Sequence, residues 1–141
     1  MNIIMERSTM KILFVDDDLM TREVMKDILK EWDVITASSG EEALEKFPDV
    51  YDLIVLADIH MPGMSGIELL RKIKTKYPYV QVIMVSSTEE SSNLLDAYES
   101  GANDFIVKPF ERDDVLAAVN HTVEKTRRWK KALGLLYRKA S

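Results

Sequence analysis

Two hydrophobic periods alternate along this chain, and their alternation constrains the fold more than any other feature. Apolar runs of four to six residues, rich in β-branched side chains, are separated by segments in which apolar residues recur at helical spacing. Several runs are apolar at nearly every position, as strands buried on both faces must be. The runs are Lys11–Val15, Val34–Ala37, Leu53–Ala57, Val80–Val85 and Asp104–Val107. The alternation predicts an open, doubly wound α/β fold in which five parallel strands, joined by right-handed crossovers, alternate with five helices.

The length and composition of the chain indicate one globular domain. It has 141 residues, of which 46% are hydrophobic and 30% are charged, and a chain of this size supports a single hydrophobic core. No stretch reaches the roughly 18–20 uninterrupted apolar residues of a membrane-spanning helix. The segment from Met1 to Met10 contains no apolar signal core. We therefore expect a cytoplasmic protein with no membrane span.

The absence of cysteine narrows the chemistry that is open to this chain. Without cysteine there is no disulfide, no thiolate nucleophile and no zinc site built on sulfur. The chain has only two histidines, which are too few to favour a metal centre built on imidazole ligands. A bound metal is therefore expected to have oxygen ligands.

The charge is distributed unevenly along the chain. Residues 1–123 hold 12 Lys and Arg against 23 Asp and Glu, a net charge of −11, whereas residues 124–141 hold 7 against 1, a net charge of +6. An acidic body repels phosphate backbones, so we expect no direct nucleic-acid binding by residues 1–123. The basic tail alone is suited to an anionic partner.

The last predicted helix continues into this basic tail. Apolar and threonine side chains recur there with alternating spacings of four and three residues, the pattern of a coiled-coil seam. The seam consists of Val115, Val119, Thr122, Thr126, Trp129, Leu133 and Leu136. Two interpretations of its later part remain open: a frayed, solvated end, or a helical linker that pairs with another copy or leads into an effector domain.

Polar residues that could carry chemistry follow four of the predicted strands. They are Asp16, Asp17 and Asp18 after the first strand, Asp58 after the third, Ser86 and Ser87 after the fourth, and Lys108 after the fifth. In doubly wound folds the carboxyl ends of the strands meet at the ligand-binding edge. Clustered carboxylates repel one another unless a cation neutralises them, and an oxygen site of this kind suits Mg²⁺ or Mn²⁺. The lysine and the hydroxyl suit the oxygens of a phosphoryl group.

Taken together, these motifs resemble those of a known family. In order along the chain they are Ile12–Asp18 with Arg22, Gly40–Leu44, Asp58–Gly66, Val85–Ser87, Gly101–Phe105 and Lys108–Phe110. From about Met10 to Val123 the chain resembles the receiver domain of two-component response regulators. The resemblance implies a flavodoxin-like sheet with strand order 2-1-3-4-5. It also implies a receiver domain at residues 10–123, followed by a basic helical tail or linker at residues 124–141.

The resemblance implies phosphoryl transfer from a sensor histidine kinase, or from a phosphotransfer protein, to the carboxylate of Asp58. Asp17, Asp58 and the backbone carbonyl of His60 would bind Mg²⁺, or Mn²⁺, and Asp16 would act largely through bound water. Lys108 would pair with a phosphoryl oxygen, and Ser86 would donate a hydrogen bond to one. Such a protein is a phosphoacceptor that catalyses only its own phosphorylation and dephosphorylation.

The resemblance also implies a switch. Ser86 would move toward the phosphoryl group, and Phe105 would fill the space that it leaves. The surface of the fourth helix, fifth strand and fifth helix, roughly Glu90 to Val123, would then change toward an output domain, a protein partner or a second copy that binds on phosphorylation. The His60 side chain would influence how fast water removes the phosphoryl group, and Leu19 to Lys30 would set kinase specificity.

Some points remain open in the sequence. Five residues separate Asp52 from Asp58, one more than is usual in this family, so either the third strand is bulged or the turn before it is shorter. Asp18 is a further acidic group at the metal site or, as we favour, a carboxylate at the start of a helix. Two alternative functions are a haloacid-dehalogenase-like phosphohydrolase, whose nucleophile motif the chain misses at Met20, and a degenerate receiver that acts as a constitutive docking module.

Overall fold

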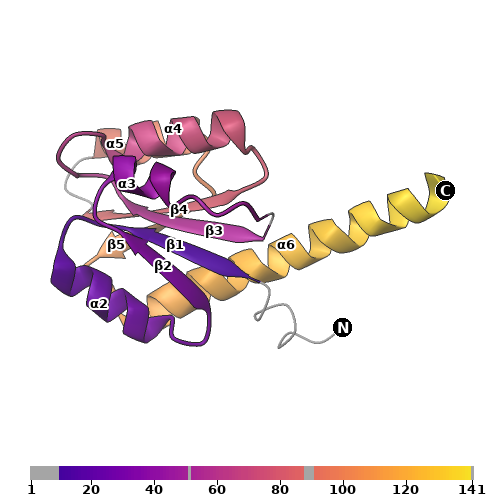
Figure 1. Cartoon of the computed structure of the whole chain (residues 1–141), viewed down its shortest axis with the longest axis horizontal. Coiled ribbons are helices and arrows are strands. Elements are labelled where there is room, and N and C mark those ends of the chain that lie inside the picture. The colour runs from indigo at the N-terminus through magenta and orange to yellow at the C-terminus, as the bar shows by residue number, and fades with distance from the viewer. Residues whose placement is uncertain (1–9, 51, 88–90, 141) are drawn as a thin grey trace.

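Five parallel strands form one sheet in the order β2-β1-β3-β4-β5, as predicted (Figure 1). The computed structural model describes residues 10–50, 52–87 and 91–140, with side chains described for 10–50, 52–87 and 92–134. The strands are β1 (Lys11–Val15), β2 (Asp33–Ala37), β3 (Leu53–Asp58), β4 (Gln81–Ser87) and β5 (Asp104–Lys108). Asp58, Ser86 and Lys108 thus lie within the last residues of their strands rather than after them, because backbone pairing continues to these positions.

The register of β3 resolves the spacing before Asp58. Its pairing with β1 is continuous from Lys11 opposite Leu53 to Val15 opposite Ala57, and every residue of β3 is buried. The strand is therefore unbulged, which leaves the shorter preceding turn as the explanation.

One helix follows each strand, and the first three of these helices begin at side chains that cap them. The helices are α2 (Leu19–Ile28), α3 (Gly40–Glu45), α4 (Gly66–Lys76), α5 (Ser91–Glu99) and α6 (Arg112–Ala140). Asp18, Ser39 and Ser65 each accept a hydrogen bond from the backbone N–H three residues later, which satisfies a donor that the first helical turn leaves free. Asp18 is therefore a helix-start carboxylate, as favoured from the sequence.

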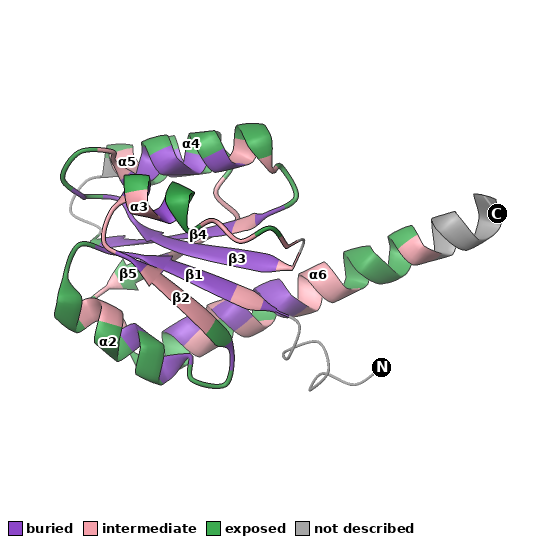
Figure 2. Cartoon of the chain, viewed as in Figure 1, coloured by how far each residue is buried: buried purple, intermediate pink, exposed green. Residues whose placement is uncertain are grey.

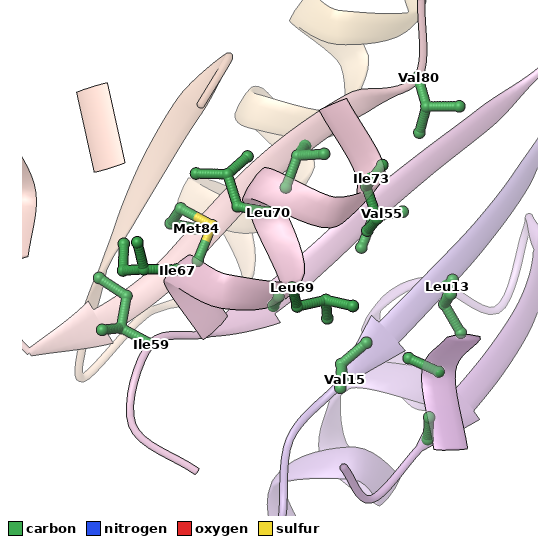
Figure 3. Close-up of a cluster of buried hydrophobic side chains, with 14 of the residues drawn as sticks. Leu13, Val15, Val55, Ile59, Ile67, Leu69, Leu70, Ile73, Val80 and Met84 are labelled. Carbon is green, nitrogen blue, oxygen red and sulfur yellow. The ribbon is translucent and has the colours of Figure 1, made fainter. Parts of the chain in front are cut away.

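Helices cover both faces of the sheet with separate apolar cores. On one face, α2 and α6 pack through a cluster that includes Met25, Leu29, Val115 and Val119. On the other face, α3, α4 and α5 pack through a second cluster, part of which is drawn in Figure 3. Labelled members of that cluster are Leu13, Val15, Val55, Ile59, Ile67, Leu69, Leu70, Ile73, Val80 and Met84. Side chains alternate between the two clusters along β1 and β3, and this double burial explains the nearly continuous apolar runs.

The predicted extension of the last helix is confirmed. Helix α6 is continuous from Arg112 to Ala140 and runs beyond the sheet (Figure 1), so the boundary predicted at 123/124 falls inside it. The end of the seam, at the Leu136 side chain, lies outside the described side chains. In the described part of the chain, no helix is long and apolar enough to cross a membrane.

Candidate functional site

The polar residues predicted at the strand ends meet at one edge of the sheet. Asp16 follows β1 directly and is only 1% exposed, and Asp58 at the end of β3 is 7% exposed. Ser86 in β4 is also buried, whereas Asp17 is exposed. The parallel arrangement of β1, β3, β4 and β5 brings these groups together because it aligns their carboxyl ends.

Three carboxylates form a group with the geometry of a cation site. One oxygen from each of Asp16, Asp17 and Asp58 lies within 4.8 Å of the others. Two of these residues are buried and one faces solvent, which suits a hard divalent ion that keeps part of its water shell. The donor set, oxygen only, fits Mg²⁺ or Mn²⁺.

Lys108 links two of these carboxylates. Its Nζ lies 3.0 Å from Oδ2 of Asp16 and 3.5 Å from Oδ2 of Asp58. Burial of the ammonium group disfavours its charge, but the hydrogen bond to Asp16 and the charge of Asp58 outweigh this and raise the pKa of Lys108. Lys108 is therefore held as a cation beside Asp58.

Burial dominates the electrostatics of Asp58. Desolvation raises the pKa of its carboxyl group above the usual range, the charge of Lys108 opposes this, and the charge of Asp16 adds to it. The ionised carboxylate is thus less stable here than in water. A bound cation, or an electrophilic group that reacts with the carboxylate, would offset this unfavourable free energy.

The first strand end is held in place by two local contacts. Nη1 of Arg22 donates to the backbone oxygen of Asp16 at 2.8 Å, and the backbone N–H of Asp18 donates to Oδ1 of Asp16 at 2.9 Å. With one oxygen held by this N–H and the other by Lys108, the Asp16 carboxylate has a defined orientation.

Comparison with known proteins shows which family has this arrangement of carboxylates and lysine. Residues 12–120 match the model of the response regulator receiver domain. The chain belongs to the receiver family. It is 43% identical over 113 residues to "Chemotaxis protein CheY" of Listeria monocytogenes, covering 78% of this chain and 95% of that protein.

Other similarities agree with a receiver. A "Cyclic di-GMP phosphodiesterase" of Thermotoga maritima is 38% identical over 116 residues, which cover 81% of this chain but 31% of that larger protein. A crystal structure of a response regulator receiver domain protein from Clostridium thermocellum superposes with a TM-score of 0.80 at 30% identity, covering 85% of this chain and 98% of that one. These matches favour the signalling interpretation over the phosphohydrolase interpretation.

The loop after β3 is shaped by contacts that the sequence did not predict in this receiver. A Cβ at Gly66 would lie 2.0 Å from the backbone oxygen of Asp58, and the Gly66 N–H donates to the backbone oxygen of Ile59 at 2.8 Å. The Met64 N–H donates to Oε1 of Glu41 at 2.9 Å. The chain thus turns back tightly on Asp58. Gly66, the last residue of the Asp58–Gly66 motif, was the sequence signal for this close approach.

In this receiver the His60 side chain lies in solvent, whereas the Phe105 side chain packs against the core. His60 is exposed, and its Nε2 lies 3.1 Å from Nδ2 of Asn93 on α5, a contact that the sequence did not indicate. Phe105 is partly buried and packs against the core cluster under α4. Glu90, the start of the predicted output surface, lies outside the described residues.

Proposed function

We propose that this receiver accepts a phosphoryl group on Asp58 from a phosphohistidine of a sensor histidine kinase or of a phosphotransfer protein. The observation that carries the proposal is the position of the Lys108 ammonium group, 3.0 Å from Asp16 and 3.5 Å from Asp58, beside three converging carboxylates. One carboxylate as nucleophile, with cationic groups around it, is the arrangement that phosphoryl transfer requires.

In the proposed reaction, an oxygen of the ionised Asp58 attacks the phosphorus atom. An O–P bond forms, the N–P bond of the donor imidazole breaks, and the electron pair of that bond leaves with the imidazole nitrogen. The product is an acyl phosphate on Asp58. Lys108 pairs with a phosphoryl oxygen, for which its raised pKa keeps it charged. Ser86 donates a hydrogen bond from its hydroxyl group to another oxygen.

Asp17, Asp58 and the backbone carbonyl of His60 would hold Mg²⁺ or Mn²⁺ directly, and Asp16 would act mainly through water. When bound, the ion supplies positive charge that offsets the charge of the carboxylates and of the phosphoryl oxygens. Arg22 keeps the backbone at Asp16 in place, and Gly66 allows the loop to pass close to Asp58.

The proposed switch uses Ser86 and Phe105. A Ser86 hydroxyl drawn toward the phosphoryl group leaves space that the partly buried Phe105 ring enters. The output surface, formed by α5, β5 and the first part of α6, then changes, and it exposes apolar side chains suited to a partner. These are Leu94, Leu95, Tyr98 and Val107. The partner is an output domain, a separate protein or, on phosphorylation, a second copy.

The kinase is proposed to bind beside the acceptor, on α2. Leu19, Met20 and Val24 are exposed on this helix. A groove of about 590 Å³ runs from α2 to Lys108 and is lined in part by Met20, Val24 and Phe110. An apolar surface next to the acceptor would orient a donor helix that carries the phosphohistidine.

We further propose that residues 10–123 form the receiver unit and residues 124–141 a helical tail or linker. The protein is placed in the cytoplasm, where histidine kinases present their phosphoryl groups. The only turnover assigned to it is its own phosphorylation and dephosphorylation, and the His60 side chain influences the rate at which water reaches the acyl phosphate.

Intact mass tests the proposal directly. Wild type and Asp58→Asn are incubated with acetyl phosphate, each with Mg²⁺ and with a chelator. One added phosphoryl group is expected in wild type with Mg²⁺, lost on standing, and none in the other three samples. Labelling of Asp58→Asn at the wild-type rate would contradict the assignment of the acceptor, and no labelling in any sample would favour the degenerate docking module.

A further inference from the structure

The last helix carries an apolar stripe past the edge of the sheet. Val115, Val119 and Val123 of α6 are buried in the core, and the same side of the helix continues at Trp129 and Leu133. There the side chains are 65% and 47% exposed. Figure 2 shows this part of α6 as mostly exposed helix beyond the sheet. Large apolar side chains in a row on an exposed helix mark an interaction surface.

A groove lies between this stripe and the adjacent edge of the sheet. Its volume is about 520 Å³, and it is lined by Asp52, Tyr79, Gln81, Thr126, Trp129, Lys130 and Leu133. Tyr79 is 49% exposed. Oε1 of Gln81 is buried and has no hydrogen-bond partner among the described residues, and Asp52 contributes a carboxylate that contacts Lys130. The groove therefore presents a mainly apolar surface that includes Tyr79, Trp129 and Leu133, beside a carboxylate that Lys130 already contacts.

We propose that a second copy of this chain covers the stripe, with the two α6 helices antiparallel and the end of each helix lying along the groove of the other. Residues 125–141 contain seven Lys or Arg residues and no Asp or Glu, interleaved with apolar residues. The end of the helix thus supplies apolar side chains to an apolar groove and positive charge to an acidic body. The opposite net charges of residues 1–123 and 124–141 attract the tail of one copy to the body of the other.

The antiparallel direction follows from where the body of the protein lies. The sheet packs on the stripe side of α6 up to Val123, so a parallel partner helix on that side would bring the two bodies into the same space. In the antiparallel arrangement the bodies lie at opposite ends. Residues 124–140 form about 25 Å of helix, and pairing Trp129 opposite Leu133 carries the end of each helix to the groove of its partner.

The same geometry disfavours a membrane as the occupant. A flat bilayer on the stripe side of the helix would meet the body of the protein before it met Trp129 and Leu133. A second helix is narrow enough, at a separation of about 8–10 Å between axes, to enter beside the stripe.

Sedimentation velocity over a concentration series tests the proposal on the full chain. Wild type and Asp58→Asn are both expected to dimerise, because the stripe lies away from the acceptor, so failure of the phosphoacceptor assignment would not affect this result. Trp129→Lys and Leu133→Lys should each weaken the dimer at least about tenfold. Leu44→Lys, the same kind of exchange at an exposed apolar residue of α3, is the matched control and should leave the dimer unchanged.

A distance measurement tests the direction. The chain has no cysteine, so Asp113→Cys near the start of α6 takes a single spin label. Antiparallel helices centred near residue 131 would separate the two labels by about 55 Å, whereas a parallel pair would hold them at well under half that distance. A wild-type monomer at all concentrations, a Trp129→Lys dimer of unchanged affinity, short label distances, or binding of Trp129 to vesicles of anionic lipid in place of dimerisation would each overturn the proposal.

Discussion

Nζ of Lys108 lies 3.5 Å from Oδ2 of Asp58 across the end of the sheet. The same ammonium group contacts Asp16 at 3.0 Å. It therefore neutralises part of the negative charge that a divalent cation would also neutralise. Lys108 and the cation are competitors for the carboxylates until a phosphoryl group brings further oxygens to the site.

Removal of this competitor should tighten cation binding. Lys108→Met deletes the ammonium charge and keeps an unbranched side chain, and at pH 8 we expect the affinity for Mg²⁺ to rise by a factor of about ten, since charges a few Å apart in a partly buried site interact strongly. Isothermal titration calorimetry measures the affinity. Lys108→Arg keeps the charge and should remain near wild type. A weaker Mg²⁺ complex in Lys108→Met would mean that the lysine supports the cation site.

Neutralisation of Asp58 should stabilise the fold at neutral pH. The pKa of Asp58 is raised in the folded protein, so the folded state holds this proton more tightly than the unfolded chain does. The contribution of Asp58 to the free energy of unfolding is therefore fully present below the usual pKa of an aspartate. It is lost as the pH rises through the pKa that Asp58 has in the folded protein. Asp58→Asn should therefore unfold at a higher urea concentration than wild type at pH 7 in the presence of a chelator.

The difference between Asp58→Asn and wild type should disappear as the pH falls and wild-type Asp58 becomes protonated. Urea titrations from pH 7 to pH 4 measure this convergence. A constant difference across the range would show that the effect of the substitution arises from packing rather than from charge.

Glu42 should stabilise the fold in the opposite pH range. Hydrogen bonds from Lys46 and Ser38 lower the pKa of Glu42 from 4.5 to about 2. A lowered folded pKa gives stability that is present above the unfolded pKa and is lost as the pH falls through the folded value. Between pH 5 and pH 2.5, the free energy of unfolding should fall more steeply for wild type than for Glu42→Gln.

The control for Glu42 is Glu45→Gln, an exposed neighbour on the same helix. Its pH dependence should follow wild type. Equal slopes for wild type and Glu42→Gln would contradict the contribution assigned to the contacts with Lys46 and Ser38.

Two glycine substitutions should have opposite effects. A Cβ at Gly66 would lie 2.0 Å from the backbone oxygen of Asp58, and Gly66→Ala should destabilise the protein by about 3 kcal/mol or more, because the backbone must move. Gly134, in the exposed part of α6, has nothing within 4 Å of an added Cβ. Gly134→Ala should stabilise its helix by about 0.5–1 kcal/mol. Thermal unfolding measures both effects.

The two glycine variants should also differ in how readily Asp58 is phosphorylated. Labelling of Asp58 by acetyl phosphate should be strongly reduced in Gly66→Ala and unchanged in Gly134→Ala. Wild-type labelling of Gly66→Ala would show that the loop relaxes without moving the acceptor.

Local pattern was sufficient for much of this protein. The apolar runs predicted all five strands, because a strand buried on both faces must be apolar along its length. The same runs located Asp16, Asp58, Ser86 and Lys108 at one edge, because parallel strands align their carboxyl ends. The spacing of Val115 to Leu133 predicted that the last helix continues, which the structure confirms.

Other features depend on contacts between segments that are distant in the chain. Glu41 reaches Met64 and His60 reaches Asn93 only because α3, α4 and α5 pack on the same face of the sheet. No local pattern encodes such distances. The contacts of the Lys108 ammonium group are also long-range, since Lys108 comes 92 positions after Asp16.

Periodicity and residue type, which are local properties of the chain, were enough to predict the order of the elements, the edge at which the charged groups meet, and the contrast between an acidic body and a basic tail. The packed fold was needed to show that β3 is unbulged, that Gly66 passes against Asp58, and that Trp129 and Leu133 remain exposed beyond the sheet. These outcomes depend on which surfaces the packed elements cover, and packing is a property of the whole fold.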